Sequence, residues 1–452
     1  MKVLTPLWDH QKAALQFLQQ RQSRLSRSGD GLFMDVGTGK TLTSLAYAAD
    51  MSARNILIAT TDKAVTVFPK DIAKHVDQAR YLELNKISIP KRMQALNTVQ
   101  RGTYDEPLFV IVNYEAMWRE PLASALHAFR FDLVLSDEAQ KIKSHNSKQG
   151  KFLHQLGKSI DARVGLTATP FHNGPLDIFG IARFLDDRVF GKSWNKFRYT
   201  YARYSEYNRH VLIEYRNLDD LYQKTSTFSF RVESSVLDLP EERVIVHPIA
   251  MPNNVRKAYK SFSKDMLYEF DNGTVVADNP LVKLLRLHQL TGGNATFDDG
   301  KTVLIDAFKG KALAEFIDSF PMDEPLVIFY KFEADLALIW ANVNRDKGVL
   351  NGSQNEYEDW VAGKFPVLIV QVGAGGAGID LTRARYSIIY SMGFSLGDFT
   401  QLKGRLHRPG QTRAVTHYVF AVEDSIDTYA LEAIETKAEP TNYILSRLRG
   451  YR

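Results

Sequence analysis

Residues 36–41 of this chain read Val36-Gly37-Thr38-Gly39-Lys40-Thr41. The apolar run Leu32–Asp35 precedes this stretch, and a strong helix-forming run, Leu42–Ala49, follows it. In such a strand–loop–helix unit, glycines let backbone N–H groups converge on phosphate oxygens, and the helix N-terminus adds a favourable dipole. The stretch therefore predicts an α/β fold with a phosphate-binding loop. The predicted nucleotide contacts are Gly37, Thr38, Gly39, Lys40 and Thr41, with Lys40 at the terminal phosphates and Thr41 as a ligand of Mg²⁺.

A second motif supports the nucleotide site. The apolar run Phe131–Ser136 ends in two adjacent acids, Asp137 and Glu138. At the carboxyl edge of a parallel sheet, Asp137 can hold Mg²⁺ through its water shell, and Glu138 can polarise the attacking water. Gln140 can bond the γ-phosphate region or a facing lobe. Since Met34 stands where the strict phosphate-loop motif has glycine, residues 36–41 alone could also form a Gly-rich turn with an exposed lysine.

The composition indicates an ordered globular chain. With 452 residues, of which 44% are hydrophobic and 24% charged, two or three domains are expected. The net charge of +5 permits a polyanionic partner without requiring one. The absence of cysteine excludes disulfides and thiolate chemistry, and fits an intracellular protein. Because the N-terminus lacks a signal-like apolar core and the apolar runs are strand-sized, we expect a cytoplasmic protein that is neither secreted nor membrane-bound.

Short apolar runs alternate with helical patterns along the chain. This alternation predicts parallel sheets covered by helices, and two sets of about five runs imply two similar α/β lobes. The expected strands are Leu32–Asp35, Ile56–Thr60, Phe109–Asn113, Leu133–Asp137 and Val164–Thr167 in the first set, and Leu326–Tyr330, Val349–Leu350, Val367–Gln371, Ser387–Tyr390 and His417–Val422 in the second.

The segment between the two sets separates the lobes. Pro240 and its charged neighbours make residues 236–244 the predicted linker. We expect an ATP-binding lobe over residues 1–235, with a helical protrusion at about 175–230. A second lobe is expected over 245–452, with a helical insertion at about 250–315. Thr291-Gly292-Gly293-Asn294 is predicted to form an exposed turn.

A basic motif lies near the C-terminal end. Residues 404–411 read Gly404-Arg405-Leu406-His407-Arg408-Pro409-Gly410-Gln411. Arg405 and Arg408 are three residues apart, so on a helix they would share a face. If the second lobe closes on the first, their guanidinium groups can offset the charge that builds on the transferred phosphoryl group. A basic helix with ordinary surface ion pairs is the alternative.

These residues together resemble the superfamily-two helicases, and within them the Swi/Snf-like double-stranded DNA translocases. The resemblance runs from about Leu7 to about Ala438, and the chain is similar to the compact versions found in bacteriophages and in fork-remodelling enzymes. It departs from the family at Gln140, where histidine is usual, and at Gly373, where many relatives have lysine. The matching segments are Gln11, Asp35–Thr41, Asp137–Gln140, Leu166–Pro170, Gly373–Leu381 and Gln401–Gln411.

The resemblance implies two tandem RecA-like lobes, each a parallel sheet flanked by helices, with helical protrusions. It implies ATP and Mg²⁺ as cofactors, and Arg405 and Arg408 as arginine fingers. Gln11 would recognise adenine, since a glutamine side chain offers a donor and an acceptor together. Gln401 would contact the nucleotide or the acidic strand. Asp380 is a candidate for the ribose hydroxyls, although a turn or cap aspartate is nearly as good an interpretation.

The family places DNA-backbone contacts on loops after the strands, where small polar groups and cations suit phosphate tracking. Cations also alternate with aromatic residues in Lys192–Tyr204, where the aromatics could stack a base or be buried. The candidate DNA contacts are Thr61, Lys63, Asn113, Tyr114, Lys141, Lys143, Lys331, Ser353, Gly375 and Gly376.

We therefore expect a monomeric, ATP-driven motor on duplex or branched DNA, active in fork remodelling or branch migration during replication, recombination or repair. An RNA helicase is an alternative of the same class, but the ending His407–Gln411 and the extension His172-Asn173 favour DNA. A scaffold or nuclease-associated subunit that retains the fold is a further alternative.

Overall fold

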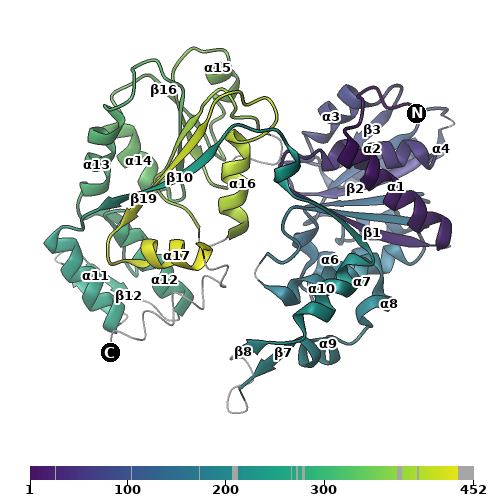
Figure 1. Ribbon diagram of the computed structural model, residues 1–452, viewed down its shortest axis with the longest axis horizontal. Coiled ribbons are helices and arrows are strands. Elements are labelled where there is room, and N and C mark those ends of the chain that lie inside the picture. Colours follow the sequence, from purple (N-terminus) through teal and green to yellow (C-terminus); the bar gives the residue numbers. More distant parts are fainter. Residues whose placement is uncertain are drawn as a thin grey trace. The chain divides into compact units, whose positions relative to one another are not determined.

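A computed structural model describes residues 1–25, 27–102, 104–172, 174–205, 212–265, 267–270, 273–276, 280–373, 379–393 and 396–435. The chain divides into two compact units, with the boundary between Asp238 and Leu239 (Figure 1). Each unit is described by itself. Within these ranges no helix combines the length and the apolar character that crossing a bilayer requires.

The first unit is built on a seven-stranded sheet in the order β3-β4-β2-β5-β6-β1-β9, whose strand pairs are all parallel. Its central strands are apolar throughout because both faces are buried: Leu57 packs into one core cluster, and Ile56 and Ile58 into the other. The strands are β1 (Ser28–Met34), β2 (Asn55–Thr60), β3 (Arg80–Glu83), β4 (Leu108–Asn113), β5 (Leu133–Asp137), β6 (Ala162–Thr167) and β9 (Ser229–Val232).

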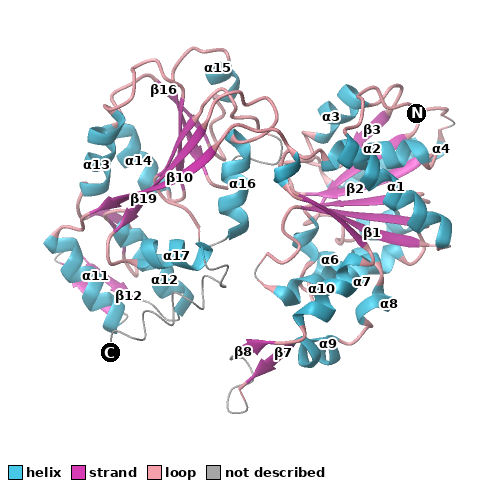
Figure 2. Ribbon diagram, in the orientation of Figure 1, coloured by secondary structure: helices cyan, strands magenta, loops and turns pink. Residues whose placement is uncertain are grey.

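Helices cover both faces of this sheet (Figure 2). The face that Ile56 and Ile58 line is covered by α1 (Asp9–Arg24), α2 (Lys40–Asp50) and α3 (Phe68–His75). The other face is covered by α4 (Ile89–Arg101), α5 (Leu122–Ala128), α6 (Lys148–Gly157) and α7 (Ile178–Leu185). Short 3-10 turns, η1 (Ala139–Ile142) and η2 (Pro175–Asp177), lie between these elements.

A smaller group of elements lies before and after β9 in the first unit. Phe197 and Tyr201 of this group are buried in the core, whereas Tyr199 is 56% exposed. Most aromatic residues of Lys192–Tyr204 therefore pack against the core. This agrees with the interpretation in which they are buried. The elements are α8 (Asp187–Phe190), α9 (Trp194–Tyr201), the antiparallel pair β7 (Ala202–Tyr204) and β8 (Leu212–Tyr215), α10 (Leu218–Ser226) and η3 (Ser234–Val236).

The second unit contains a six-stranded parallel sheet in the order β10-β19-β18-β15-β17-β16. Apolar residues again alternate between two clusters, so that Ile328 faces one cluster and Phe329 the other. The strands are β10 (Glu242–Ile249), β15 (Leu326–Tyr330), β16 (Lys347–Leu350), β17 (Val367–Gln371), β18 (Tyr386–Ile389) and β19 (Val415–Val422). The helices from Phe308 onwards are α13 (Phe308–Ile317), α14 (Glu333–Asn342), α15 (Tyr357–Val361), α16 (Leu396–Leu406) and α17 (Ile426–Glu435).

An insertion between β10 and α13 combines helices with two small antiparallel pairs. Its elements are α11 (Asn253–Asp265), β11 (Leu267–Phe270), β12 (Gly273–Val276), α12 (Pro280–Thr291), β13 (Asn294–Thr296) and β14 (Thr302–Leu304). Thr291 and Asn294 are buried here, which corrects the prediction of an exposed turn. The turn packs inside the unit because the Thr291 hydroxyl donates to the Asp427 carboxylate at 3.0 Å.

The predicted α/β class with two parallel sheets is confirmed. Three expected strands, Leu133–Asp137, Leu326–Tyr330 and Val367–Gln371, have the bounds that the sequence predicted. The expected linker, 236–244, contains the unit boundary but overlaps β10, which begins at Glu242 and extends the second sheet. Sequence patterns missed β3, β9 and β10, because these strands lie at or near sheet edges and carry charged or polar residues among their apolar ones.

Candidate active site

The candidate phosphate-binding loop of the first unit joins β1 to α2, which is the strand–loop–helix arrangement that the sequence predicted. Gly37 and Gly39 have positive φ values of 84° and 87°, and Gly39 caps the N-terminus of α2. A Cβ atom at position 39 would lie 2.1 Å from Gln11 Nε2. Both the backbone conformation and the close approach therefore require glycine at position 39.

The Gln11 side chain is hydrogen-bonded to the backbone of this loop. The side chain is buried; its Nε2 donates to the Thr38 carbonyl at 3.0 Å, and its Oε1 accepts from the Trp8 N–H at 2.9 Å. His10 Nε2 also lies 2.9 Å from the Thr38 carbonyl. Both ends of the Gln11 amide thus bond the backbone in this structure, and its role in adenine recognition stays a prediction.

Lys40 lies at the start of α2 and folds back over the end of β1. Its Nζ donates to the carbonyl of Met34 at 2.7 Å and to that of Asp35 at 3.1 Å. Thr41, the next residue, is half-buried in the first turn of α2. The ammonium group would exchange carbonyl oxygens for phosphate oxygens when a nucleotide enters the loop.

Asp137 ends β5 at the carboxyl edge of the sheet. One of its carboxylate oxygens, Oδ2, accepts a hydrogen bond from Thr60 Oγ1 at 2.7 Å, and the residue is 8% exposed. Burial, and then the neighbouring Glu138 carboxylate, raises the pKa of Asp137 to about 7. A buried carboxylate at the end of a strand suits a divalent ion, which is commonly bound by one or two protein carboxylates together with substrate phosphates. Asp137 and Thr41 are therefore the residues that would hold Mg²⁺.

Glu138 and Gln140 are joined by their side chains. Glu138 has a φ of 51° and begins the 3-10 turn η1. Gln140 Nε2 donates to Glu138 Oε2 at 2.5 Å, and Gln140 Oε1 accepts from Thr167 Oγ1 at 2.6 Å. Thr167 Oγ1 in turn accepts from the Thr169 N–H at 3.0 Å. A continuous hydrogen-bonded chain thus runs from the candidate catalytic carboxylate to the loop after β6.

The candidate arginines lie in the second unit. Arg405 is in the last turn of α16, which ends at Leu406, so Arg408 lies beyond the helix and the predicted shared helical face is wrong. Arg408 Nη1 donates to the Ile379 carbonyl at 3.3 Å, and Arg408 Nε lies 3.9 Å from Asp380 Oδ2. The backbone joins the same segments, since the Leu381 N–H donates to the Arg405 carbonyl at 3.0 Å.

Asp380 and Gln401 have less specific surroundings. Asp380 Oδ1 accepts from both the N–H and the hydroxyl of Thr382, at 2.9 and 2.6 Å, which is the geometry of a turn-forming aspartate. Its second oxygen faces Arg408. Gln401 is half-buried on α16. The predicted nucleotide contacts of these two residues stay predictions.

Two residues that support the arginine segment were not found from the sequence. Gln411 is buried, and its Nε2 donates to the carbonyls of Thr382 and Ala384 at 3.1 and 2.9 Å. Glu242 on β10 accepts from Lys403 Nζ at 2.5 Å, and its other oxygen lies 3.3 Å from His417 Nε2. Gln411 belongs to the motif at residues 404–411, but no role was predicted for it. No local pattern marks Glu242, because its partners lie more than 150 residues away in the chain.

The candidate DNA contacts divide by exposure. Lys63, Lys141 and Ser353 are exposed, and Thr61 is partly so. Lys143 forms an ion pair with Asp177 at 3.5 Å. The predictions for Gly375 and Gly376 lie outside the described residues.

Other candidate contacts are internal. Tyr114 is 1% exposed, and its hydroxyl donates to the Asp137 carbonyl at 2.5 Å, which corrects the prediction that its side chain contacts DNA. The ring packs in a core cluster of the first unit beside β5, and burial raises the pKa of the hydroxyl well above its usual range. Asn113 is also buried, with its Nδ2 donating to Asp62 Oδ1 at 2.6 Å.

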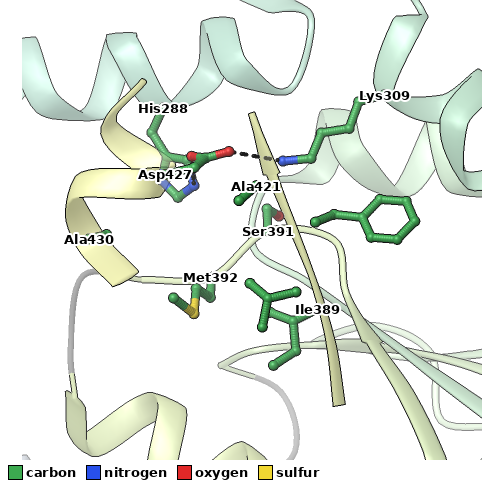
Figure 3. A pocket seen from close by; sticks show the side chains of 10 residues that line it. His288, Lys309, Ile389, Ser391, Met392, Ala421, Asp427 and Ala430 are labelled. Atoms are coloured by element: carbon green, nitrogen blue, oxygen red, sulfur yellow. Dashed lines mark hydrogen bonds and ion pairs between the residues drawn. The ribbon is translucent and has the colours of Figure 1, made fainter. Parts of the chain in front are cut away.

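Lys331 belongs to a loop that a buried polar cluster holds in place. The Lys331 N–H donates to Ser391 Oγ at 2.9 Å, and Ser391 Oγ donates to Asp335 Oδ2 at 2.5 Å. Beside Ser391, Lys309 Nζ lies 3.2 Å from Asp427 Oδ2, and both residues line a small pocket together with His288 (Figure 3). Burial lowers the pKa of Lys331 and lowers that of His288 to about 3, so the His288 ring is neutral at neutral pH.

Comparison with protein families matches residues 10–292 to the SNF2-related domain and residues 346–410 to the helicase conserved C-terminal domain. The first match alone covers more than half of the chain. It contains every candidate residue of the phosphate loop and of the acidic strand, and the second contains Arg405 and Arg408.

Individual relatives are distant in sequence, but their matches cover most of this chain. The uncharacterized ATP-dependent helicase YqhH of Bacillus subtilis (strain 168) is 25% identical over 434 residues, which cover 89% of this chain and 74% of that protein. The DNA annealing helicase and endonuclease ZRANB3 of Bos taurus is 22% identical over 462 residues, 98% of this chain and 41% of that protein. Among solved structures, the Sulfolobus solfataricus SWI2/SNF2 ATPase core in complex with dsDNA is 19% identical, with a TM-score of 0.46, and the match covers 96% of this chain and 92% of that chain.

Proposed function

The chain belongs to the SNF2-related family, and from this membership we propose that it couples ATP hydrolysis to movement along duplex or branched DNA. It is an ATP-hydrolysing enzyme of the helicase class. The observation that carries the proposal is the arrangement at the carboxyl edge of the first sheet. There the phosphate loop follows β1, and the Asp137 carboxylate and the hydrogen-bonded pair Glu138 and Gln140 follow β5, with only β6 between these two parallel strands.

Each candidate site residue of the first unit that is named below has a role in this proposal. The loop N–H groups and Lys40 bind the phosphates, and Glu138 orients the water that attacks the γ-phosphorus and accepts its proton. Asp137, held by Thr60, is the metal-binding carboxylate. Mg²⁺, when bound with ATP, neutralises charge on the β- and γ-phosphates.

Arg405 and Arg408 complete the proposed reaction. An arginine that approaches the transferred phosphoryl group lowers the barrier by offsetting its charge. We propose that ATP binding favours closure of the lobes with these residues at the phosphates, and that hydrolysis and release favour opening. Alternate gripping of the DNA backbone by the two lobes would then advance the enzyme. The Gln140–Thr167–Thr169 chain is a candidate path for linking hydrolysis to this movement.

DNA is the proposed track. A relative whose match covers 98% of this chain and 41% of that protein is named a DNA annealing helicase and endonuclease, which supports DNA as the track. Exposed Lys63, Lys141 and Ser353 on loops after strands are suited to phosphate contacts. The working unit in this proposal is a single chain, which light scattering of the enzyme on DNA would measure.

ATPase assays with different nucleic acids test the proposal. Turnover is measured alone and with linear duplex, forked DNA, a four-way junction, single-stranded DNA and RNA. We expect strong stimulation by duplex DNA and the strongest by forked or four-way substrates. Equal stimulation by linear and branched duplexes would remove the branched-DNA role, and stimulation by RNA alone would replace the DNA motor with an RNA helicase.

A further inference from the structure

Helix α11 of the second unit has one face made of lysines. Lys257, Lys260 and Lys264 are all exposed and, at 100° per residue, they fall within a narrow arc of the helix surface. The opposite face, with Val255, Ala258, Tyr259 and Phe262, is buried in the core of the unit. The fold therefore fixes the direction in which the lysines point, and α11 lies at the outside of this unit in Figure 1.

These lysines lack the acidic neighbours that usually accompany an exposed charged helix. None of the residues three or four positions from any of them is acidic, and Lys260 and Lys264 are themselves four apart. Like charges at this spacing destabilise a helix. By contrast, Lys224 of α10 pairs with Asp220 at 2.9 Å, and Lys12 of α1 pairs with Asp9 at 2.9 Å.

Among the residues whose side chains the structure describes, no acid pairs with the lysine face. Asp424 is 3.8 Å from Arg256, which lies to one side of the face. Asp265 ends the helix and points about 80° or more away from the lysines. Within the part of the chain that the structure describes, none of the three lysines forms an ion pair, so their charge is available to an external anion.

We propose that Lys257, Lys260 and Lys264 bind the phosphate backbone of DNA, as a contact additional to those on the strand-end loops. The three ammonium groups extend over about 10 Å of helix, and duplex DNA carries one charge per about 1.7 Å of its axis. A row of exposed lysines suits contact with the phosphate backbone, which involves no base readout. This inference rests on the proposed function, because it names a second surface for the same DNA.

The salt dependence of DNA binding tests this contact. A variant with Lys257→Gln, Lys260→Gln and Lys264→Gln is compared with the unchanged protein by fluorescence anisotropy on a blunt duplex between about 50 and about 200 mM salt. Each lost phosphate contact reduces the slope of log K against log salt by about 0.9, so the variant should lose about 2.7. Over this range, the affinity of the unchanged protein should fall about forty-fold more than that of the variant.

A matched control separates this contact from total charge. Lys91→Gln, Lys301→Gln and Lys364→Gln remove the same charge from scattered exposed positions and should change the slope by less than about 1. Equal slopes for the α11 variant and the unchanged protein, with equal unfolding temperatures, would overturn the inference while DNA binding itself persists. If the unchanged protein does not bind duplex DNA at all, the proposed function fails, which is a separate outcome.

Discussion

The Gln140 side chain donates a hydrogen bond to the Glu138 carboxylate at 2.5 Å. The carbonyl end of the same amide accepts from Thr167 at 2.6 Å. In the family that the sequence resembles, this position is usually a histidine, which has no amide oxygen. In this chain the bond to Thr167 is made by the amide oxygen of Gln140. The candidate catalytic carboxylate of Glu138 is thus bonded to a residue that also bonds Thr167 at the end of β6.

Gln140→Ala should reduce kcat for DNA-stimulated ATP hydrolysis by about tenfold, because Glu138 loses the group that orients it. Gln140→Glu should reduce it further, since a second carboxylate beside Glu138 adds like-charge repulsion. Steady-state kinetics with saturating duplex DNA measure both effects. Gln149→Ala, which removes a half-buried glutamine that bonds the Lys141 carbonyl of the same turn, is the control. Unchanged kcat in Gln140→Ala would show that Glu138 does not need this partner.

Gly39→Ala should abolish ATP binding and lower stability. Alanine is strained at a φ of 87°, and its Cβ would meet Gln11 Nε2 at 2.1 Å. We expect a loss of about 1–3 kcal/mol in the free energy of unfolding, measured by denaturant titration. Gly352→Ala, where a Cβ meets nothing within 4 Å, is the matched control. A Gly39→Ala protein that binds ATP normally would contradict the assigned loop geometry.

Asp137→Asn should stabilise the nucleotide-free protein at high pH. The folded-state pKa of Asp137, about 7, lies above its ordinary value of 3.8, so ionisation costs stability that accumulates as pH rises from about 4 to about 7. The gain in unfolding temperature should therefore be larger at pH 8 than at pH 5. Thermal unfolding without Mg²⁺ or ATP measures it. An equal gain at both pH values would mean that ionisation of Asp137 does not destabilise the folded protein.

Glu242→Gln should destabilise the second unit at neutral pH. Burial alone would raise the pKa of Glu242, but contacts with His417 and Lys403 outweigh it and lower the pKa to about 2. The stabilisation is complete above about pH 4.5 and is lost as pH falls towards 2. We expect a loss of about 1–3 kcal/mol at pH 7 that shrinks on acidification. Glu241→Gln, whose carboxylate only pairs with exposed Arg243, is the control; equal losses in both variants would count against this role.

The sequence predicted the two sheets well because parallel central strands are apolar on both faces, as in β5, β15 and β17. It also placed the phosphate loop and the acidic strand, since both depend on local patterns. Strands such as β10, with Glu242 and Arg243 at its start, carry no such pattern. Their pairing depends on a distant partner, here β19, which single-sequence reasoning does not see.

Within the candidate site, residue type was easier to predict than surroundings. Tyr114 follows a strand, as a DNA-contacting residue would, yet tertiary packing buries it against β5. Gln11 was assigned to adenine, but the structure also gives it a bond to Thr38 that no spacing rule predicts. Arg408 was placed on a helix that ends two residues earlier, because Pro409 and Gly410 stop the helix before them.

The most direct test of the central claim is ATP turnover by the unchanged enzyme and by Glu138→Gln, each with and without duplex DNA. The account predicts strong DNA stimulation of the unchanged enzyme and loss of at least about 100-fold in kcat for Glu138→Gln, with duplex binding retained. Near-normal hydrolysis by Glu138→Gln, or turnover in the unchanged enzyme that ignores duplex DNA, would contradict it.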